Sequence, residues 1–236
     1  MDWTADALIL NRRAHGESSA IVDLFTREHG RYTGLVRGGN ARRLRPVLQS
    51  GNMVQASWRA RLAEHLGTMV VEAKRPYAAE LMEDALKLAA LSSLCALLYI
   101  TPERQAYPRL YDTALVVLDN LTGDMWLPVM ARFELALLEE MGFGLDLSSC
   151  AASGVRENLT HVSPRSGRAV CRAEAAPYLD KLFALPDFLH QPVADISPND
   201  IKDGFKLTGY FLEQRLYAPN GVKLPPARTR FVDLIL

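Results

Sequence analysis

The feature that most constrains the fold is a series of five short strand-like segments that ends at Pro76. Turn residues bound these segments, which cover residues 7–11, 20–26, 31–37, 53–61 and 68–74. In the fourth, Val54, Ala56 and Trp58 alternate with polar residues, as in a strand with one buried face. Five strands in so short a span predict a small closed barrel, and the five-stranded OB-fold is the commonest answer.

Beyond Pro76 the pattern becomes helical. Apolar residues recur at helical spacing over residues 79–100, 108–121 and 124–141. We expect Asp124 to cap the third of these helices. A capping box between Ser197 and Asp200, with a proline at the first helical position, predicts a fourth helix to about residue 216. The chain is therefore predicted to be an α+β protein with an N-terminal barrel and a helical body.

Composition narrows the cellular setting. Apolar residues make up 49% of the chain, enough for a packed core. Three cysteines are few, and an odd number cannot all pair, so a disulfide framework is not expected. Acidic Asp2 and Asp6 argue against a secretory leader, and the longest apolar run, residues 88–102, is too short to cross a bilayer. We expect a cytoplasmic protein with no membrane partner.

Charge is distributed unevenly, although the formal net charge is zero. Residues 1–76 contain twelve Lys and Arg and seven Asp and Glu (12 − 7 = +5), so the remainder carries −5. Between residues 29 and 63 there are seven arginines and no acid. Such asymmetry indicates a polyanionic partner for the N-terminal half.

The arginines of the predicted barrel are the candidate nucleic-acid site. Cations displace counterions along a phosphate backbone, and arginine forms planar forks with phosphates. A connector at residues 38–46, rich in glycine and arginine, is expected to act as a mobile cationic clamp, with Tyr32 as a candidate for base stacking. The alternative is a solvated basic face without a partner. The candidate DNA-binding residues are Arg12, Arg13, Arg31, Arg37, Arg42, Arg43, Arg45, Arg59 and Arg61.

Residues 147–174 contain a degenerate metal-site pattern. Cys150 and Cys171 each begin a half-motif spaced as in a four-cysteine zinc ribbon, but Ser153 and Glu174 replace the second cysteines. Zinc favours four strong ligands, so we expect no zinc and no other cofactor. The alternative is a weak site that uses Glu174 or His161 as an additional ligand.

The chain carries no catalytic motif of the kinds that mark phosphate loops, serine hydrolases or zinc proteases. A binding protein is therefore expected, not an enzyme. In the third predicted helix, Arg132 beside Phe133 suits a partner peptide that carries acids or ends in a carboxylate. From the sequence alone, an Arg132 paired with Glu134 or another neighbour on the helix surface is the favoured alternative.

Motifs in order along nearly the whole chain resemble the RecO family of bacterial recombination mediators. They include Gly16-Glu-Ser18, Asp23-Leu-Phe-Thr-Arg-Glu-His-Gly30, Leu35-Val-Arg-Gly-Gly39, Arg132-Phe-Glu-Leu-Ala-Leu-Leu138, Gly142-Phe-Gly-Leu-Asp146 and Val162-Ser-Pro-Arg-Ser-Gly167. The resemblance implies an OB-fold over residues 1–77 and a helical domain over residues 78–146 and 176–236, the latter including a C-terminal tail. It also implies a zinc-ribbon-like insertion at residues 147–175, here degenerate.

The same resemblance implies a function in DNA repair and recombination. It implies binding of single- and double-stranded DNA, annealing of complementary strands and, with RecR, loading of RecA onto DNA coated by single-strand-binding protein. The helical domain is expected to recognise the acidic C-terminal tail of that coating protein through Arg132 and Phe133. The alternatives are another OB-fold protein that binds single-stranded RNA without mediator activity, a metal-dependent enzyme built on the ribbon, and an adaptor for an acidic protein.

Overall fold

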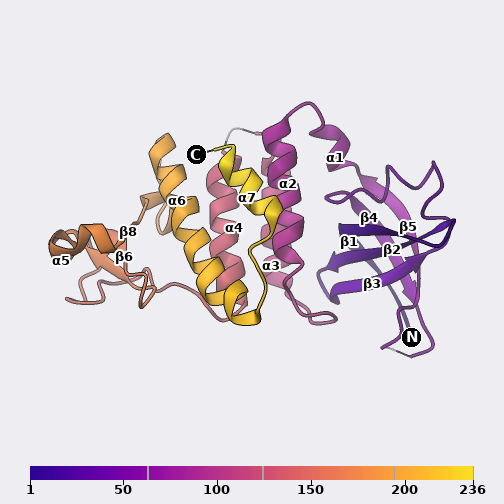
Figure 1. The fold of residues 1–236 in the computed structure, drawn as a ribbon, viewed down its shortest axis with the longest axis horizontal. Coiled ribbons are helices and arrows are strands. Elements are labelled where there is room, and N and C mark those ends of the chain that lie inside the picture. Colours follow the sequence, from indigo (N-terminus) through magenta and orange to yellow (C-terminus); the bar gives the residue numbers. More distant parts are fainter. Residues whose placement is uncertain (63, 124, 194, 236) are drawn as a thin grey trace. The chain divides into compact units, whose positions relative to one another are not determined.

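The computed structural model describes residues 1–62, 64–123, 125–193 and 195–235. The chain divides into two compact units, one formed by Met1–Asp119 with Pro225–Phe231 and the other by Asn120–Leu224 with Val232–Leu236. Figure 1 labels the elements of both. The predicted fold class, an α+β protein with an N-terminal five-stranded barrel and a helical remainder, is confirmed. The four-part domain division made from the sequence stays a prediction.

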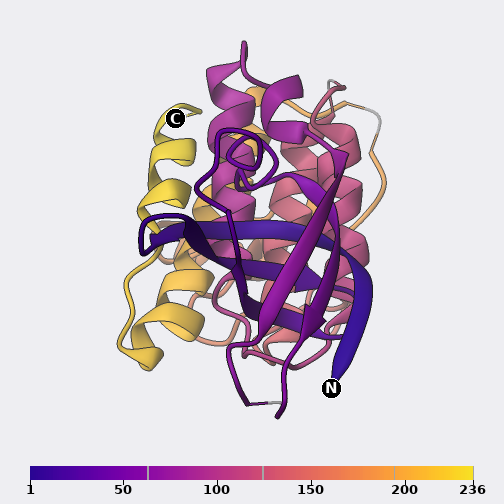
Figure 2. The ribbon, with the colours of Figure 1, turned by 90° about the vertical axis from the view of Figure 1, so that its right-hand side faces the viewer.

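The first unit is built on a closed barrel with strand order β1-β2-β3-β5-β4 (Figure 2). Its strands are β1 (Asp2–His15), β2 (Ser19–Thr26), β3 (Gly30–Val36), β4 (Met53–Arg59) and β5 (Thr68–Arg75). The interior is filled by apolar side chains, among them Val22, Leu24, Val54, Ala56 and Trp58. The alternation seen in the sequence of β4 thus places its apolar residues in the core, as predicted.

Strand β1 is much longer than the expected segment of residues 7–11. Its first half pairs with β4, from Asp2 to Leu8, and its second half pairs with β2, from Ala7 to His15. The register shifts between Ile9 and Asn11, so the buried face changes partway along the strand. A single alternation pattern cannot describe such a strand, because its two halves face different neighbours.

Helices complete the first unit. They are α1 (Tyr77–Glu80), α2 (Ala85–Leu98), α3 (Pro108–Asn120) and α7 (Pro226–Asp233), the last two each having residues in both units. The continuous helix expected over residues 79–100 is wrong, because Asp84 interrupts it. The Asp84 carboxylate accepts hydrogen bonds from the backbone N–H groups of Leu86 and Lys87 at 3.1 and 3.0 Å and starts a new helix there.

The second unit combines helices with a small sheet. Helix α4 (Trp126–Glu140) and helix α6 (Pro198–Phe211) pack against each other, and α6 continues as a π-helix, η3 (Leu212–Tyr217). The predicted capping box between Ser197 and Asp200 is present at the start of α6. The expected cap Asp124 lies outside the described residues. The 3₁₀ turns are η1 (Ala176–Lys181), η2 (Asp187–Leu189) and η4 (Ala218–Asn220).

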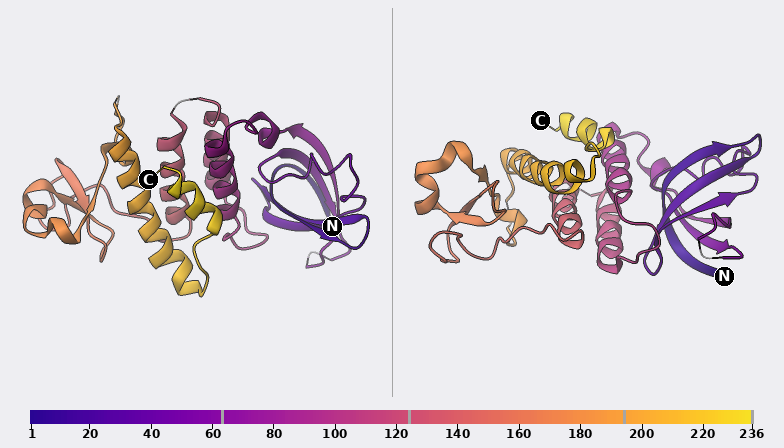
Figure 3. Two further views of the ribbon diagram at one scale, coloured as in Figure 1. Left: turned by 45° about the horizontal axis from the view of Figure 1, so that its top comes forward. Right: turned by 60° about the horizontal axis from the view of Figure 1, so that its bottom comes forward.

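The sheet of the second unit has the order β7-β6-β8 and appears with α5 in orange in Figure 3. Its strands are β6 (Leu159–Val162), β7 (Ala169–Cys171) and β8 (Phe183–Ala184), and α5 (Arg172–Ala175) follows β7 directly. This is the segment that the sequence marked as ribbon-like. No helix in the described part of the chain is long and apolar enough to cross a membrane.

Candidate nucleic-acid interface

Cross-strand pairing places five residues from successive strands side by side, in a line around the barrel. Arg13 lies opposite Ile21, Ile21 opposite Leu35, Leu35 opposite Thr68, and Thr68 opposite Arg59. Arg13, Thr68 and Arg59 are exposed, and Ile21 and Leu35 are half-buried. With strands about 4.8 Å apart, this line spans roughly 20 Å. We call these five residues the arginine band, which joins cations from distant parts of the sequence.

The band is flanked by one acid and one further cation. Arg59 also lies opposite Asp2 on β1, so the line returns to β1 eleven residues before Arg13. This stagger is what closing a small barrel requires. Exposed Arg61 follows two residues after Arg59. Asp2 is exposed and places one carboxylate beside the arginines.

The connector between β3 and β4 supplies the second group of cations. Exposed Arg37 follows β3 directly, and Arg42, Arg43 and Arg45 are exposed on the segment of residues 38–46, which we call the arginine loop. The chain turns back on itself here, with the backbone N–H groups of Leu44 and Arg45 both donating to the Ala41 carbonyl at 3.0 and 3.2 Å.

Asn40 anchors the arginine loop to the turn between β1 and β2. Its backbone N–H donates to the Ser18 carbonyl at 2.9 Å, and its own carbonyl accepts from Arg45 Nε at 2.9 Å. Arg12 donates to the Asn40 side chain and, at 3.2 Å, to the Gly39 carbonyl. The segment expected to be a mobile clamp is therefore held by hydrogen bonds to the β1–β2 turn. Arg12 supports this loop through Gly39 and Asn40.

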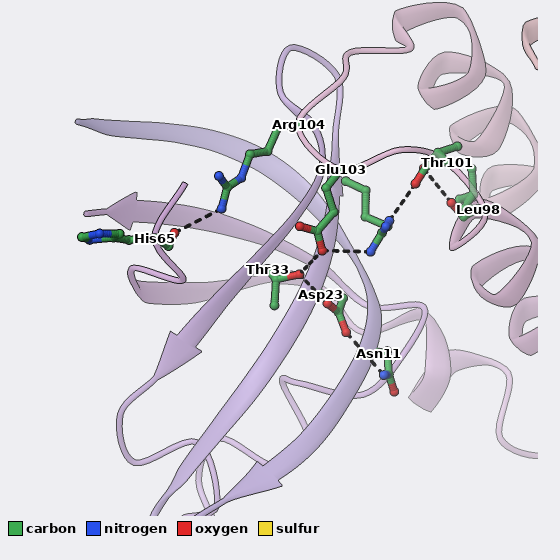
Figure 4. A network of polar contacts seen from close by, with 9 residues as sticks. Asn11, Asp23, Thr33, His65, Leu98, Thr101, Glu103 and Arg104 are labelled. Atoms are coloured by element: carbon green, nitrogen blue, oxygen red, sulfur yellow. Dashed lines mark hydrogen bonds and ion pairs between the residues drawn. The ribbon is translucent and has the colours of Figure 1, made fainter. Parts of the chain in front are cut away.

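The outer face of β2 and β3 is covered by the loop between α2 and α3 (Figure 4). Arg31 donates from Nε to the Thr101 carbonyl at 2.8 Å and pairs with Glu103 at 3.1 Å, and only 15% of its side chain is exposed. The Thr33 hydroxyl lies 2.9 Å from Glu103 and 2.7 Å from buried Asp23. OB-folds commonly bind oligonucleotides on this face. In this protein the α2–α3 loop covers that face around Arg31.

Arg104 is a residue that sequence reasoning missed. Its backbone is left-handed, with φ of 63°, and its N–H donates to the Arg31 carbonyl at 2.8 Å. Its guanidinium lies over the Tyr32 ring, 5.3 Å from the centroid, and donates to the His65 carbonyl at 3.2 Å. Figure 4 shows the Arg104 guanidinium pointing toward the His65 carbonyl. Only a positive φ on a non-glycine residue would have marked it, and φ cannot be read from sequence.

The expected stacking residue, Tyr32, is not available to bases. It is 8% exposed and makes edge contacts with the rings of Trp3 and Trp58, at centroid distances of 5.2 and 5.0 Å. The three residues between the two cations of the arginine band are Ile21, Leu35 and Thr68, and none of them is aromatic.

In the second unit, Arg132 projects from α4 at the edge of a cavity of about 430 Å³. Its Nε donates to the Phe188 carbonyl at 2.6 Å and its Nη2 to the Gln191 carbonyl at 3.1 Å, across the turn η2. The alternative pairing with Glu134 is wrong, because Glu134 is fully buried and accepts a hydrogen bond from Thr208.

Phe133 is fully buried and does not line that cavity. We therefore leave it out of the candidate peptide site. From α4 the cavity is lined by Leu135 and Ala136 together with two charged residues, Arg132 and Glu139, and the segment after α4 adds mainly aliphatic side chains. The remaining lining residues include Leu145, Leu147 and His190.

The ribbon-like segment brings Cys150 and Cys171 together. The Cys171 N–H donates to Cys150 Sγ at 3.3 Å, and the Ser153 hydroxyl lies 3.7 Å from Cys171 Sγ. Burial would raise the pKa of the Cys150 thiol, but the N–H of Cys171 and the hydroxyl of Ser153 outweigh it and lower the pKa to about 6. Cys150 and Cys171 are thus buried side by side and joined by a hydrogen bond.

The donor set does not fit zinc. Ser153 and Glu174 are exposed, and a serine hydroxyl is a poor replacement for a thiolate. Among residues 1–62, 64–123, 125–193 and 195–235, no three His, Cys, Asp or Glu side chains converge as metal ligands would. The prediction that this chain holds no zinc is left to metal analysis.

The closed barrel with exposed arginines and the helical second unit define an α+β protein with a candidate nucleic-acid surface, and the comparisons with known proteins place it among non-enzymatic proteins of DNA repair and recombination. Two family models match, "Recombination protein O N terminal" over residues 1–77 and "Recombination protein O C terminal" over residues 82–223. The chain belongs to the RecO family, as its motifs predicted.

The chain is similar to curated relatives over nearly their full length. The chain is 50% identical to the DNA repair protein RecO of Rhodospirillum centenum, over 99% of this chain and 94% of the relative. It is 49% identical to the protein of the same name from Methylobacterium nodulans, over 99% and 98%. The corresponding values for Methylocella silvestris are 46%, 98% and 95%.

Proposed function

We propose that this chain binds single- and double-stranded DNA through the arginine band and the arginine loop, and that it anneals complementary strands. The observation that carries the proposal is the barrel register, which brings Arg13 and Arg59 onto one band although 45 residues separate them in sequence. The exposed cations that we assign to DNA contact are Arg13, Arg37, Arg42, Arg43, Arg45, Arg59 and Arg61. Arg12 supports the loop, and Arg31 is left out because Glu103 and Thr101 hold it.

Annealing follows from charge and needs no covalent step. Two strands repel each other through their phosphates, and a surface of fixed guanidinium groups screens that repulsion. Base pairing then supplies the driving force. Because the loop is anchored through Asn40, its arginines are held in place before DNA arrives, and less ordering entropy is lost on binding.

Because aromatic rings of the barrel are buried, we expect DNA to be bound through its phosphates. With Tyr32 and Trp58 inside the barrel, stacking of unpaired bases contributes little, and phosphate contacts dominate. A surface that reads phosphates accepts single and double strands of any sequence. This is the property that a strand-annealing protein needs.

For the second unit we propose recognition of the acidic C-terminal tail of single-strand-binding protein. The cavity beside Arg132 combines aliphatic walls with a guanidinium whose direction is fixed by the Phe188 and Gln191 carbonyls. An apolar terminal side chain fits the walls, and a carboxylate fits the guanidinium. With RecR as a partner, such a protein would help to load RecA onto coated DNA in the cytoplasm, at the nucleoid.

The test is annealing of complementary strands coated with single-strand-binding protein. We expect the wild-type chain to anneal strands coated with the intact coat protein. On strands coated with a coat protein that lacks its last residues, we expect little annealing. An RNA pair of the same sequence serves as the comparison. Equal annealing on coats with and without the tail contradicts the peptide assignment, and preference for RNA contradicts the DNA assignment.

A further inference from the structure

The first half of β1 has a free edge. Strand β2 ends at Thr26, opposite Ala7, so residues 2–6 are paired only with β4. In antiparallel sheets the N–H and C=O of one residue point to the same side, and successive residues alternate. Ile9 exchanges hydrogen bonds with the Gly51–Asn52 backbone on the β4 side, at 2.8 and 2.9 Å. Even-numbered residues of this half therefore point away from β4.

A contact from α3 confirms this direction. The Tyr111 hydroxyl donates to the Asp6 carbonyl at 3.3 Å, so that carbonyl faces the side where β2 is missing. By the same alternation, the N–H and C=O of Thr4 point the same way. No described residue supplies a backbone hydrogen bond to Thr4 on that side.

The free edge opens into a cavity of about 510 Å³. Its lining includes Thr4, Asp6 and Gln55 from the barrel wall, Glu28 and His29 from the β2–β3 turn, and Leu115 from α3. An unpaired strand edge beside a cavity of this size is the arrangement by which folded domains take up an extended peptide as an added strand.

The charges around the cavity indicate which kind of molecule can bind there. Arg27 is tied to Asp112 at 2.9 Å and Lys74 to Asp6 at 2.6 Å, whereas Glu28 is exposed and has no ion-pair partner among the described residues. Since no ion pair in the described part of the chain offsets the negative charge of Glu28, that charge would repel a phosphate backbone, and nucleic acid is disfavoured here.

A second copy of the chain is also disfavoured. Antiparallel pairing of two such edges about Thr4 would place Asp2 of each copy opposite Asp6 of the other. Both carboxylates are exposed on the outer face, and like charges directly opposite each other destabilise a strand pair.

We propose that the free edge of β1 at residues 2–6 docks an extended segment of a partner protein, with basic side chains at alternate positions. The segment forms main-chain hydrogen bonds with Thr4. Its basic side chains lie on the outer face, near Asp2 and Glu28. This surface adjoins the arginine band at Asp2, which lies opposite Arg59, but Thr4 and the cavity are not part of the band.

The experiment uses the full chain and a fluorescent peptide, acetyl-Thr-Lys-Val-Lys-Thr-Lys-amide, in polarisation titrations. One control peptide has the same sequence with alternate backbone amides methylated, and a second has glutamate in place of each lysine. We expect both controls to bind at least about tenfold more weakly, because each loses edge hydrogen bonds or charge pairing.

Thr4→Pro removes the N–H that points into the cavity without removing a bond to β4, and we expect about tenfold weaker binding. Thr4→Val is the matched control: it keeps the backbone, loses only the side-chain contact with Ser57, and should bind as the wild type does. Leu115→Trp fills the cavity from α3 and should weaken binding even if Thr4→Pro fails to fold.

Three results would overturn the proposal. The first is equal binding of the plain and methylated peptides. The second is unchanged binding by both Thr4→Pro and Leu115→Trp. The third is a wild-type dimer in sedimentation that Thr4→Pro converts to monomer, since that would make a second copy the occupant. Oligonucleotide binding by Thr4→Pro should remain at the wild-type level throughout.

Discussion

Removing the arginine loop's cations should flatten the salt dependence of DNA binding. Arg42, Arg43 and Arg45 are exposed on an anchored loop, so each presents a charge to solvent that can contact a phosphate, Arg45 while its Nε donates to the Asn40 carbonyl. Each contact with a single strand contributes about 0.7 to the slope of log affinity against log salt. Replacing all three by Ala should therefore reduce the slope by about 2. Between 50 and 200 mM salt, a fourfold change, the ratio of wild-type to variant affinity should shrink about fifteenfold.

The assay is a polarisation titration of a labelled oligonucleotide at four or five salt concentrations. Arg27→Ala is the matched control, because Arg27 is also an exposed arginine of the barrel but its charge is already paired with Asp112. Its slope should equal that of the wild type. Arg42→Ala with Arg43→Ala, which leaves the Arg45 bond to Asn40 intact, should show about two-thirds of the effect. A triple variant with the wild-type slope would refute the loop as a DNA contact.

Four further outcomes are expected. Gly30→Ala should lower the free energy of unfolding by at least about 2 kcal/mol in denaturant titrations, because Gly30 has φ of 66° and an added Cβ would lie 1.7 Å from a loop carbonyl; unchanged stability would contradict the covered face. Arg132→Ala should weaken binding of an acidic peptide with an apolar C-terminus by about tenfold or more in calorimetry, and equal binding would exclude the cavity. The pKa of Asp146 is lowered by hydrogen bonds from Ser148 and by Arg168, so its contribution to stability is present at neutral pH and lost as pH falls through that lowered value. The stability difference between wild type and Asp146→Asn should therefore shrink below about pH 4 in thermal melts, and a constant difference would contradict the assignment. Elemental analysis of purified protein should find no stoichiometric zinc, and chelator should leave the melting temperature unchanged.

Several features of this protein were readable from local sequence. The alternation around Trp58 and the break at Pro76 predict a β region followed by helices, because strand and helix periods depend only on near neighbours. The capping box at Ser197 was likewise predictable, since both of its hydrogen bonds join residues three apart. The run of arginines without acids located the basic half of the chain, and the ordered motifs identified the family.

Other features depended on which distant segments meet. Arg31 and Arg59 were equal candidates for DNA contact in the sequence, yet the Arg31 guanidinium pairs with Glu103, 72 residues away along the chain. Tyr32 and Phe133 were expected at surfaces, and both are buried by strands or helices far along the chain. Composition near each residue held no information about these partners.

The arginine band itself exists only in the closed barrel. Arg13 and Arg59 share a line because of the stagger with which β1 pairs first with β4 and then with β2, and a shift of one residue in that register would turn each side chain to the opposite face. Sequence fixes which residues carry charge, through their chemistry alone. Their common surface was decided by register and barrel closure, which arise from packing the whole core at once.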